Sequence, residues 1–77
     1  MPDAVFVNLL ASDTALRYSA NPMFFKEVVA GNPAKRTFVI DEIQKVPALL
    51  DVVHDLIETY PAHQFVLTGS SARKLKR

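Results

Sequence analysis

Three short, mostly apolar runs without a charged residue constrain the fold of this chain more than any other feature. They are Ala4–Val7, Thr37–Ile40 and Gln64–Leu67, and each contains β-branched or aromatic residues. Runs of this kind suit strands that are buried on both faces of a parallel sheet better than the strict alternation of a half-exposed hairpin. Their first residues lie 33 and 27 positions apart, close to the length of one strand–helix–strand unit. The spacing therefore predicts parallel strands joined by helices.

The second gap carries the clearer helical pattern. Between Pro47 and Tyr60, apolar residues recur at steps of three and four and form one continuous stripe. The members of this stripe are Leu49, Leu50, Val53, Leu56, Ile57 and Tyr60. Pro61 follows directly and is expected to end the helix.

The first gap predicts two shorter helices. Ser12 or Asp13 is expected to cap the first. Asn21-Pro22 is typical of an N-cap followed by a first-turn proline and should open the second helix, which is expected to stop at Gly31. A last helix is expected to start at Ser70. The predicted class is α/β, with a three-layer-type parallel sheet of three strands and connecting helices.

Size and composition exclude several classes of function. The 77 residues leave room for one small domain, and the formal net charge of +1 gives no overall attraction to nucleic acid or to an anionic membrane. The absence of cysteine excludes disulfides, thiolate metal sites and cysteine nucleophiles. No apolar run approaches the roughly 18–20 residues that span a bilayer. We therefore expect a cytoplasmic protein.

Polar residues follow two of the predicted strands. Asp41-Glu42 comes directly after the second strand, and Thr68-Gly69-Ser70-Ser71 comes after the third. In open parallel sheets, ligands bind outside the carboxyl ends of the strands. These residues are the candidates for a binding or catalytic site, although an acidic pair after a strand is by itself a weak signal that also fits solvated carboxylates.

The longer strings around these strand ends resemble a known family. The stretch Phe38–Pro47 and the later stretch Leu67–Arg73 are similar to prokaryotic AAA-type P-loop ATPases, whose acidic strand contains "DEIQ…P" and whose next strand ends in "TGSSA". The segment Asn21–Phe25 is also similar to the region before that acidic strand, though less specifically. The resemblance spans nearly the whole chain and implies that residues 1–77 form a single partial ATPase domain with part of the P-loop NTPase fold.

The resemblance also implies roles for four residues. Asp41 would hold Mg²⁺ through water, as in a Walker B segment, and Glu42 would activate the water that attacks the γ-phosphate. Thr68 or Ser70 would sense that phosphate by a hydrogen bond, and the resemblance does not decide between them. Mg²⁺ and ATP are the cofactors implied for the intact family.

The phosphate-binding loop of this family does not occur in the sequence. That loop needs two glycines five residues apart, followed by Lys-Ser or Lys-Thr, whereas the chain has only Gly31 and Gly69. The loop supplies the backbone N–H groups and the lysine that grip the phosphates. We therefore expect that this chain alone binds neither Mg²⁺ nor ATP and is inactive as an ATPase.

Alternatives of another class stay open. In the family, the phosphate-loop strand lies beside the strand that corresponds to Gln64–Thr68, so that strand is expected to be an open edge here. An open apolar edge favours self-association or a partner chain that supplies the missing strand. The chain could then be a non-enzymatic interaction module or a complementing subunit. His54, His63 and the basic residues from Arg73 to Arg77 are expected to be solvated rather than to bind metal, nucleic acid or membrane.

Overall fold

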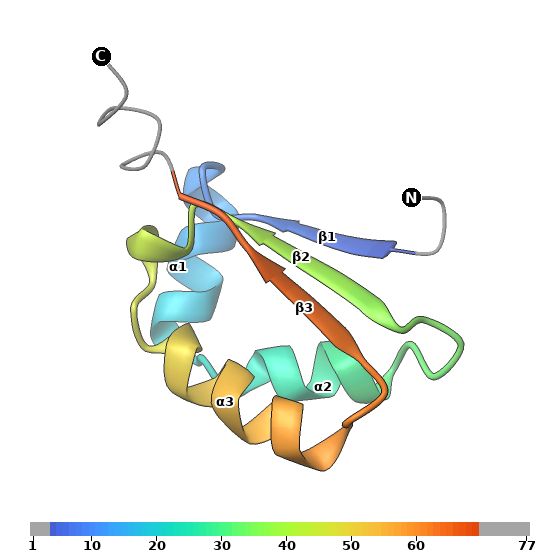
Figure 1. Cartoon of the computed structure of the whole chain (residues 1–77). Coiled ribbons are helices and arrows are strands. Elements are labelled where there is room, and N and C mark those ends of the chain that lie inside the picture. Colours follow the sequence, from blue (N-terminus) through green and yellow to red (C-terminus); the bar gives the residue numbers. More distant parts are fainter. Residues whose placement is uncertain (1–3, 70–77) are drawn as a thin grey trace.

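The computed structural model describes residues 4–69, which form one parallel sheet and three α-helices (Figure 1). The elements in chain order are β1 (Ala4–Asn8), α1 (Ser12–Ala20), α2 (Phe24–Ala30), β2 (Thr37–Asp41), the 3₁₀ turn η1 (Ile43–Lys45), α3 (Leu49–Thr59) and β3 (Gln64–Leu67). The predicted α/β class is confirmed. The helix expected to start at Ser70 lies outside the described residues.

The three strands pair in the order β1-β2-β3, and both pairs are parallel. The register aligns Phe6 with Val39 and Val66, and one residue further on it aligns Val7 with Ile40 and Leu67. Because aligned residues of a parallel sheet share a face and neighbours along a strand alternate, these two rows point to opposite faces.

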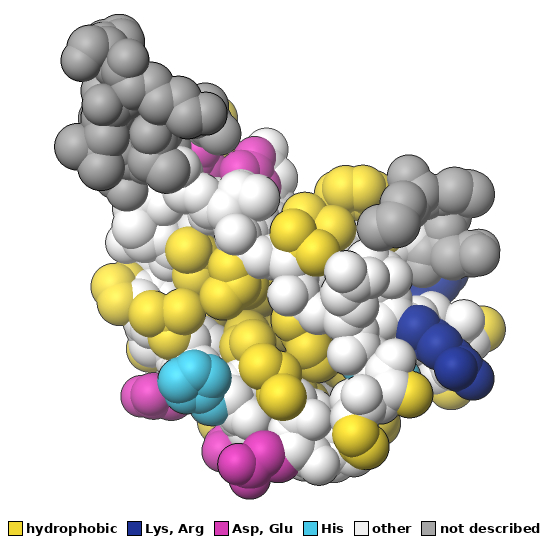
Figure 2. All heavy atoms as spheres, viewed as in Figure 1, with side chains coloured by type: hydrophobic (Ala, Val, Ile, Leu, Met, Phe, Trp, Pro, Cys, Tyr) yellow, Lys and Arg dark blue, Asp and Glu magenta, His cyan; other side chains and the backbone are white. Residues whose placement is uncertain are grey.

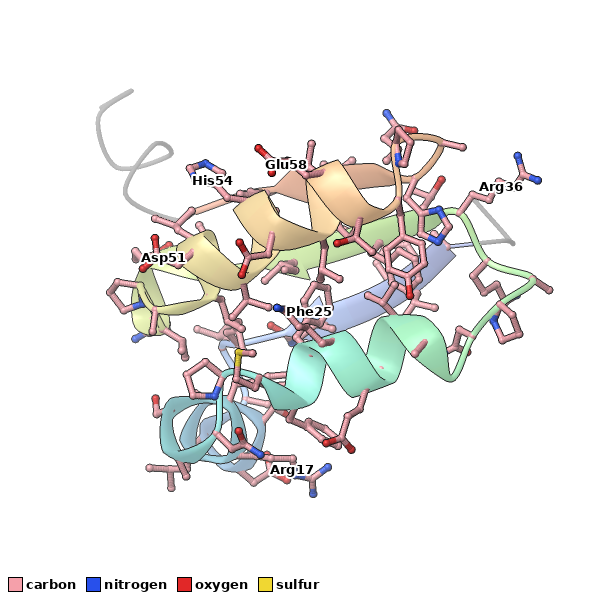
Figure 3. All side chains as sticks on the ribbon, turned by 90° about the horizontal axis from the view of Figure 1, so that it is seen from below. Arg17, Phe25, Arg36, Asp51, His54 and Glu58 are labelled. Atoms are coloured by element: carbon pink, nitrogen blue, oxygen red, sulfur yellow. The ribbon has the colours of Figure 1, made fainter. Side chains whose placement is uncertain are left out.

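All three helices lie on the same face of the sheet (Figures 1 and 3). Crossovers between parallel strands are right-handed, so a chain that adds its strands one after another in one direction keeps its helices on one side. On this side Val7, Phe38 and Ile40 are buried, whereas Phe6 on the other side is 66% exposed. The expectation of burial on both faces is wrong for residues 4–69, because no described helix covers the second face as a third layer would.

The core between sheet and helices is built around aromatic side chains. Phe25 of α2 and Phe38 of β2 have no exposed surface, and their rings meet edge to face with centroids 6.2 Å apart. Phe25 also meets Phe65 of β3 at 6.3 Å and Tyr18 of α1 at 6.2 Å. From α3, the buried residues are Leu49, Val52, Val53 and Leu56. Phe25 therefore links the first two helices to the sheet.

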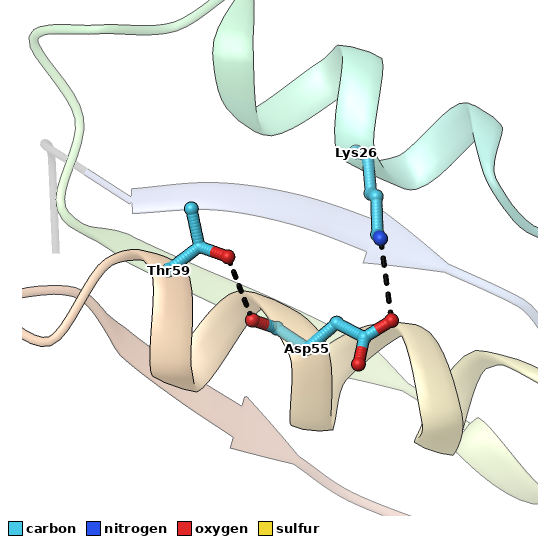
Figure 4. A network of polar contacts seen from close by, with 3 residues as sticks. All are labelled: Lys26, Asp55 and Thr59. Carbon is cyan, nitrogen blue, oxygen red and sulfur yellow. Dashed lines mark hydrogen bonds and ion pairs between the residues drawn. The ribbon is translucent and has the colours of Figure 1, made fainter.

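Two helices are also connected at the surface. Lys26 Nζ of α2 lies 3.2 Å from Asp55 Oδ2 of α3, and Thr59 Oγ1 donates to the Asp55 carbonyl oxygen at 2.9 Å (Figure 4). Both charged side chains are solvent-accessible, and pairs of this kind contribute little to stability.

The helix ends differ from the predicted caps. The N-cap of α1 is Ala11 rather than Ser12 or Asp13, and the N-cap of α2 is Met23 rather than Asn21. Neither N-cap makes a side-chain hydrogen bond, because alanine and methionine carry no side-chain oxygen that could accept one. A backbone turn leads into α2 instead, in which the Phe24 N–H donates to the Asn21 carbonyl. The predicted ends are confirmed, since Gly31 is the C-cap of α2 and α3 ends just before Tyr60-Pro61.

None of the helices in residues 4–69 has the length and apolar character needed to cross a membrane.

The central position of Phe25 leads to a stability prediction. We expect Phe25→Leu to lower the free energy of unfolding by about 1–2 kcal/mol, and Phe25→Ala by about 3–5 kcal/mol, because each leaves a cavity among the rings. The larger loss would leave most of a domain this small unfolded. Urea denaturation followed by circular dichroism measures both changes. As a matched control, Leu16→Ala, at a side chain that is 71% exposed, should stay within about 0.5 kcal/mol. Equal effects at positions 16 and 25 would contradict this account of the core.

Tyr18 leads to a prediction for alkaline pH. Burial raises the pKa of Tyr18 above its ordinary value of 10.0, and the nearby Arg17 charge opposes this only in part. The unfolded chain therefore releases the tyrosine proton before the folded chain does. The stabilisation is complete below about pH 10 and is lost as the pH rises through the raised pKa.

We expect the free energy of unfolding of the wild type to fall above about pH 10, and Tyr18→Phe to remove part of that fall. Denaturation at a series of pH values tests this. Identical pH profiles of the wild type and Tyr18→Phe would show that the Tyr18 hydroxyl does not control this loss.

Candidate functional site

The three parallel strands end on the same side of the molecule, and their carboxyl ends bring polar residues together there. Asp41 is the last residue of β2 and is aligned with Asn8, the last residue of β1. Thr68 directly follows β3, one position beyond the aligned pair of Ile40 and Leu67. Asp41 alternates with the fully buried Ile40, so it belongs to the face of the sheet that the helices leave open.

Two of the residues predicted for the site are in contact. The Thr68 hydroxyl donates a hydrogen bond to Asp41 Oδ1. The backbone holds Thr68 at this position, because its N–H donates to the Ile40 carbonyl at 3.0 Å and its carbonyl accepts from the Ile43 N–H at 2.9 Å. The carboxylate and the hydroxyl are thus fixed by the strands and by the turn that follows β2.

Glu42 has a different environment from its neighbour Asp41. Its backbone adopts the left-handed conformation, with φ 65° and ψ 46°, and within residues 4–69 no other non-glycine residue has a positive φ. This conformation is uncommon for such a residue and turns the chain sharply at the end of β2. The Glu42 residue is 1% exposed, and the Gln44 Nε2 atom donates to Glu42 Oε1 at 2.6 Å. The two adjacent carboxylates therefore differ in access to solvent.

Two residues of this region are missing from the sequence-based prediction. Asn8 was not included because the first strand was expected to end at Val7, whereas β1 extends to Asn8. Its Oδ1 atom accepts a hydrogen bond from the Leu10 N–H at 3.0 Å. Gln44 has no predicted role of its own, because its contact with Glu42 depends on the turn η1, for which the apolar pattern gives no signal. Ser70, the alternative to Thr68, lies outside the described residues.

The site has few metal ligands of its own. Within residues 4–69, no three histidine, cysteine, aspartate or glutamate side chains gather closely enough to hold a metal ion. Asp41 and Thr68 supply hard oxygen atoms of the kind that suit Mg²⁺. This donor set is compatible with Mg²⁺ that keeps most of its water and needs further ligands from a phosphate.

The two histidines lie on α3 and just before β3. His54 is exposed on α3, as expected. His63 precedes β3 and is partly buried rather than fully exposed. Its ring stacks on Tyr60 at 4.7 Å and on Phe38 at 5.6 Å, and its Nδ1 atom is buried without a hydrogen-bond partner in the described structure. His63 thus packs at the end of the core opposite the carboxyl ends of the strands.

Comparison with known proteins identifies the family of this chain. A family model described as "AAA domain" matches residues 2–77. Searches of the curated proteins and of the solved structures found no match. The matched region includes the whole parallel sheet and both strand ends that carry the candidate residues. The chain therefore belongs to the AAA domain family of P-loop ATPases.

Proposed function

We propose that this chain supplies the metal-binding and water-activating half of an AAA ATPase site. A phosphate-binding loop placed beside β3 would complete that site. The support is the contact between Asp41 and Thr68, because it joins a carboxylate and a hydroxyl at the carboxyl ends of neighbouring strands, where open parallel sheets bind their ligands.

Each residue has one role in this proposal. Asp41 would hold Mg²⁺ through water. Thr68 would sense the γ-phosphate by a hydrogen bond, with Ser70 as the alternative. Glu42 accepts a proton from the attacking water. Mg²⁺, when bound, neutralises charge that develops on the phosphate oxygens.

The burial of Glu42 sets a condition for this role. A carboxylate that is 1% exposed and accepts the Gln44 amide has little contact with water. A general base must come within hydrogen-bond reach of the water, often only in the substrate complex. The turn at residues 42–45 therefore has to open, or the incoming phosphate loop has to bring a water molecule to it.

An alternative role involves neither catalysis nor nucleotide binding. Strand β3 is one of the two outer strands of the described sheet, and an outer strand can pair with another chain. The protein would then be an interaction module, in which Asp41 and Glu42 are incidental, or it would self-associate.

The first prediction concerns hydrolysis in a completed site. We expect that mixing the 77-residue chain with a second polypeptide, which carries a strand, the sequence Gly-x-x-x-x-Gly-Lys-Thr and a helix, produces magnesium-dependent ATP hydrolysis. Glu42→Gln should then lower the turnover number by about 100-fold or more, because it removes the general base. Phosphate release measures turnover, and fluorescence anisotropy of a labelled nucleotide measures binding.

Glu42→Gln should leave nucleotide binding unchanged, whereas Asp41→Asn should weaken the magnesium-dependent part of it. Association of the two polypeptides without hydrolysis would favour the interaction module. Hydrolysis that persists at the wild-type rate in Glu42→Gln would reject the role assigned to Glu42.

The second prediction separates the effect of the Thr68 hydroxyl group from the effect of the side-chain volume. In the same two-part system, Thr68→Val should lower turnover by roughly 10-fold or more, because it removes one hydrogen-bond donor and keeps the side-chain volume. Thr68→Ser keeps the hydroxyl and should retain most of the activity. If Thr68→Val and Thr68→Ser have equal activity, the sensing role passes to Ser70 or to another group.

A further inference from the structure

Strand β1 is the outer strand on the side of the sheet away from β3, and within residues 4–69 no strand pairs with its outer edge. Natural proteins protect such an edge with a charged residue, a proline or a bulge. The five residues of β1, Ala-Val-Phe-Val-Asn, include neither a charge nor a proline, and their register with β2 is regular throughout. The outer edge of β1 is therefore suited to pairing with a further strand.

The hydrogen bonds of β1 identify the backbone groups on its outer edge. The Leu9 N–H donates to the Asp41 carbonyl at 3.0 Å, so the backbone of Leu9 points toward β2. Because backbone groups alternate in direction along a strand, those of Val7 also point toward β2, whereas those of Phe6 and the N–H of Asn8 point outward. Phe6 thus presents a donor and an acceptor in the middle of the edge.

The sequence of β1 is nearly symmetric about Phe6, with a valine on each side of it. A second copy placed antiparallel around a twofold axis at Phe6 brings the two Phe6 residues opposite each other. Each Phe6 N–H can then donate to the Phe6 carbonyl of the other copy, and the Asn8 N–H can donate to the Ala4 carbonyl. Both copies use the same strand in this contact, as a twofold dimer requires.

The Phe6 side chain supplies an apolar contact to the same arrangement. It is 66% exposed, and it is aligned with Val39 and Val66 on the face that no described helix covers. Figure 2, in the view of Figure 1, shows apolar side chains at the surface over β1. Pairing two copies would place the Phe6 rings opposite each other and remove them from water, which stabilises the pair.

Charge distinguishes the edge of β1 from the edge of β3. Helix α1, which packs against β1, carries one acidic and one basic residue, Asp13 and Arg17. Helix α3, which packs against β3, carries Asp51, Asp55 and Glu58 and neither lysine nor arginine. A second copy paired through β3 would bring two acidic helices near each other, and like charges oppose association. The charges therefore favour β1 as the strand through which two copies pair.

We propose that two copies of this chain pair antiparallel through β1, centred on Phe6, and join their sheets into one continuous sheet. The inference is independent of the proposed ATPase role. Strands β1 and β3 lie on opposite sides of β2, so a strand added beside β3 does not compete with this contact. The twofold axis points the carboxyl ends of the strands of the two copies in opposite directions, so each copy keeps its own Asp41 and Thr68.

Sedimentation velocity of the 77-residue chain tests this pairing. We expect the wild type to change from monomer to dimer as its concentration rises to about 0.5 mM. Phe6→Lys should raise the dissociation constant of the dimer by about 10-fold or more, because it places two like charges opposite each other on neighbouring strands. Since Phe6 is exposed, this variant should keep the circular dichroism spectrum of the wild type. The matched control Ile57→Lys, at a residue of α3 that is 48% exposed, should leave the dissociation constant unchanged.

Amide hydrogen exchange locates the contact. Exchange at Phe6 and Asn8 should slow by about 10-fold or more between the dilute and the concentrated wild type, because dimerisation gives these outward N–H groups a partner. The Phe65 and Leu67 N–H groups alternate with the Thr68 N–H, which donates toward β2, so they mark the outer edge of β3. Their exchange should not change with concentration.

Three outcomes would overturn the inference. The first is a chain that stays monomeric at the highest concentration. The second is a dimer whose dissociation constant is the same in Phe6→Lys as in the wild type. The third is a dimer that slows exchange at Phe65 and Leu67 and not at Phe6, which would place the contact at the edge of β3.

Discussion

The handedness of two consecutive crossovers determines most of this structure. Strands β1, β2 and β3 are added in one direction, and right-handed connections then place α1, α2 and α3 on one face. The apolar core forms on that face around Phe25 and Phe38. The same topology leaves the opposite face, with Phe6, without a described cover. It also makes β3 an outer strand of the described sheet.

The candidate site follows from the same arrangement. The carboxyl ends of parallel strands lie next to one another. Asp41 and Thr68 therefore meet although they are 27 positions apart in the sequence. Their position is fixed by backbone hydrogen bonds of the strands and of the turn after β2. What the described residues lack is a group that grips phosphate oxygens. Within residues 4–69, the outer position of β3 and the uncovered second face of the sheet are therefore two consequences of one topology, and both are compatible with the additional strand of the proposed function.

Sequence patterns predict the regular parts of the fold and miss the parts that depend on three-dimensional context. The three uncharged runs predict all three strands, and the apolar stripe between Pro47 and Tyr60 predicts α3. Burial on both faces was predicted incorrectly for β1, because an apolar run does not reveal whether a second layer covers it. The contact between Gln44 and Glu42 depends on a left-handed turn, which no propensity of glutamate indicates. Proximity of Asp41 and Thr68 was predictable, since both follow strands of a parallel sheet, but the choice between Thr68 and Ser70 was not.

We propose that the acidic strand end cannot hold a triphosphate without a second set of phosphate ligands. The most direct test is nuclear magnetic resonance of the isolated 77-residue chain during titration with MgATP. The account predicts that the amide signals of Asp41, Glu42 and Thr68 stay unchanged at millimolar nucleotide. Saturable shifts of these three signals that disappear in Asp41→Asn would contradict it.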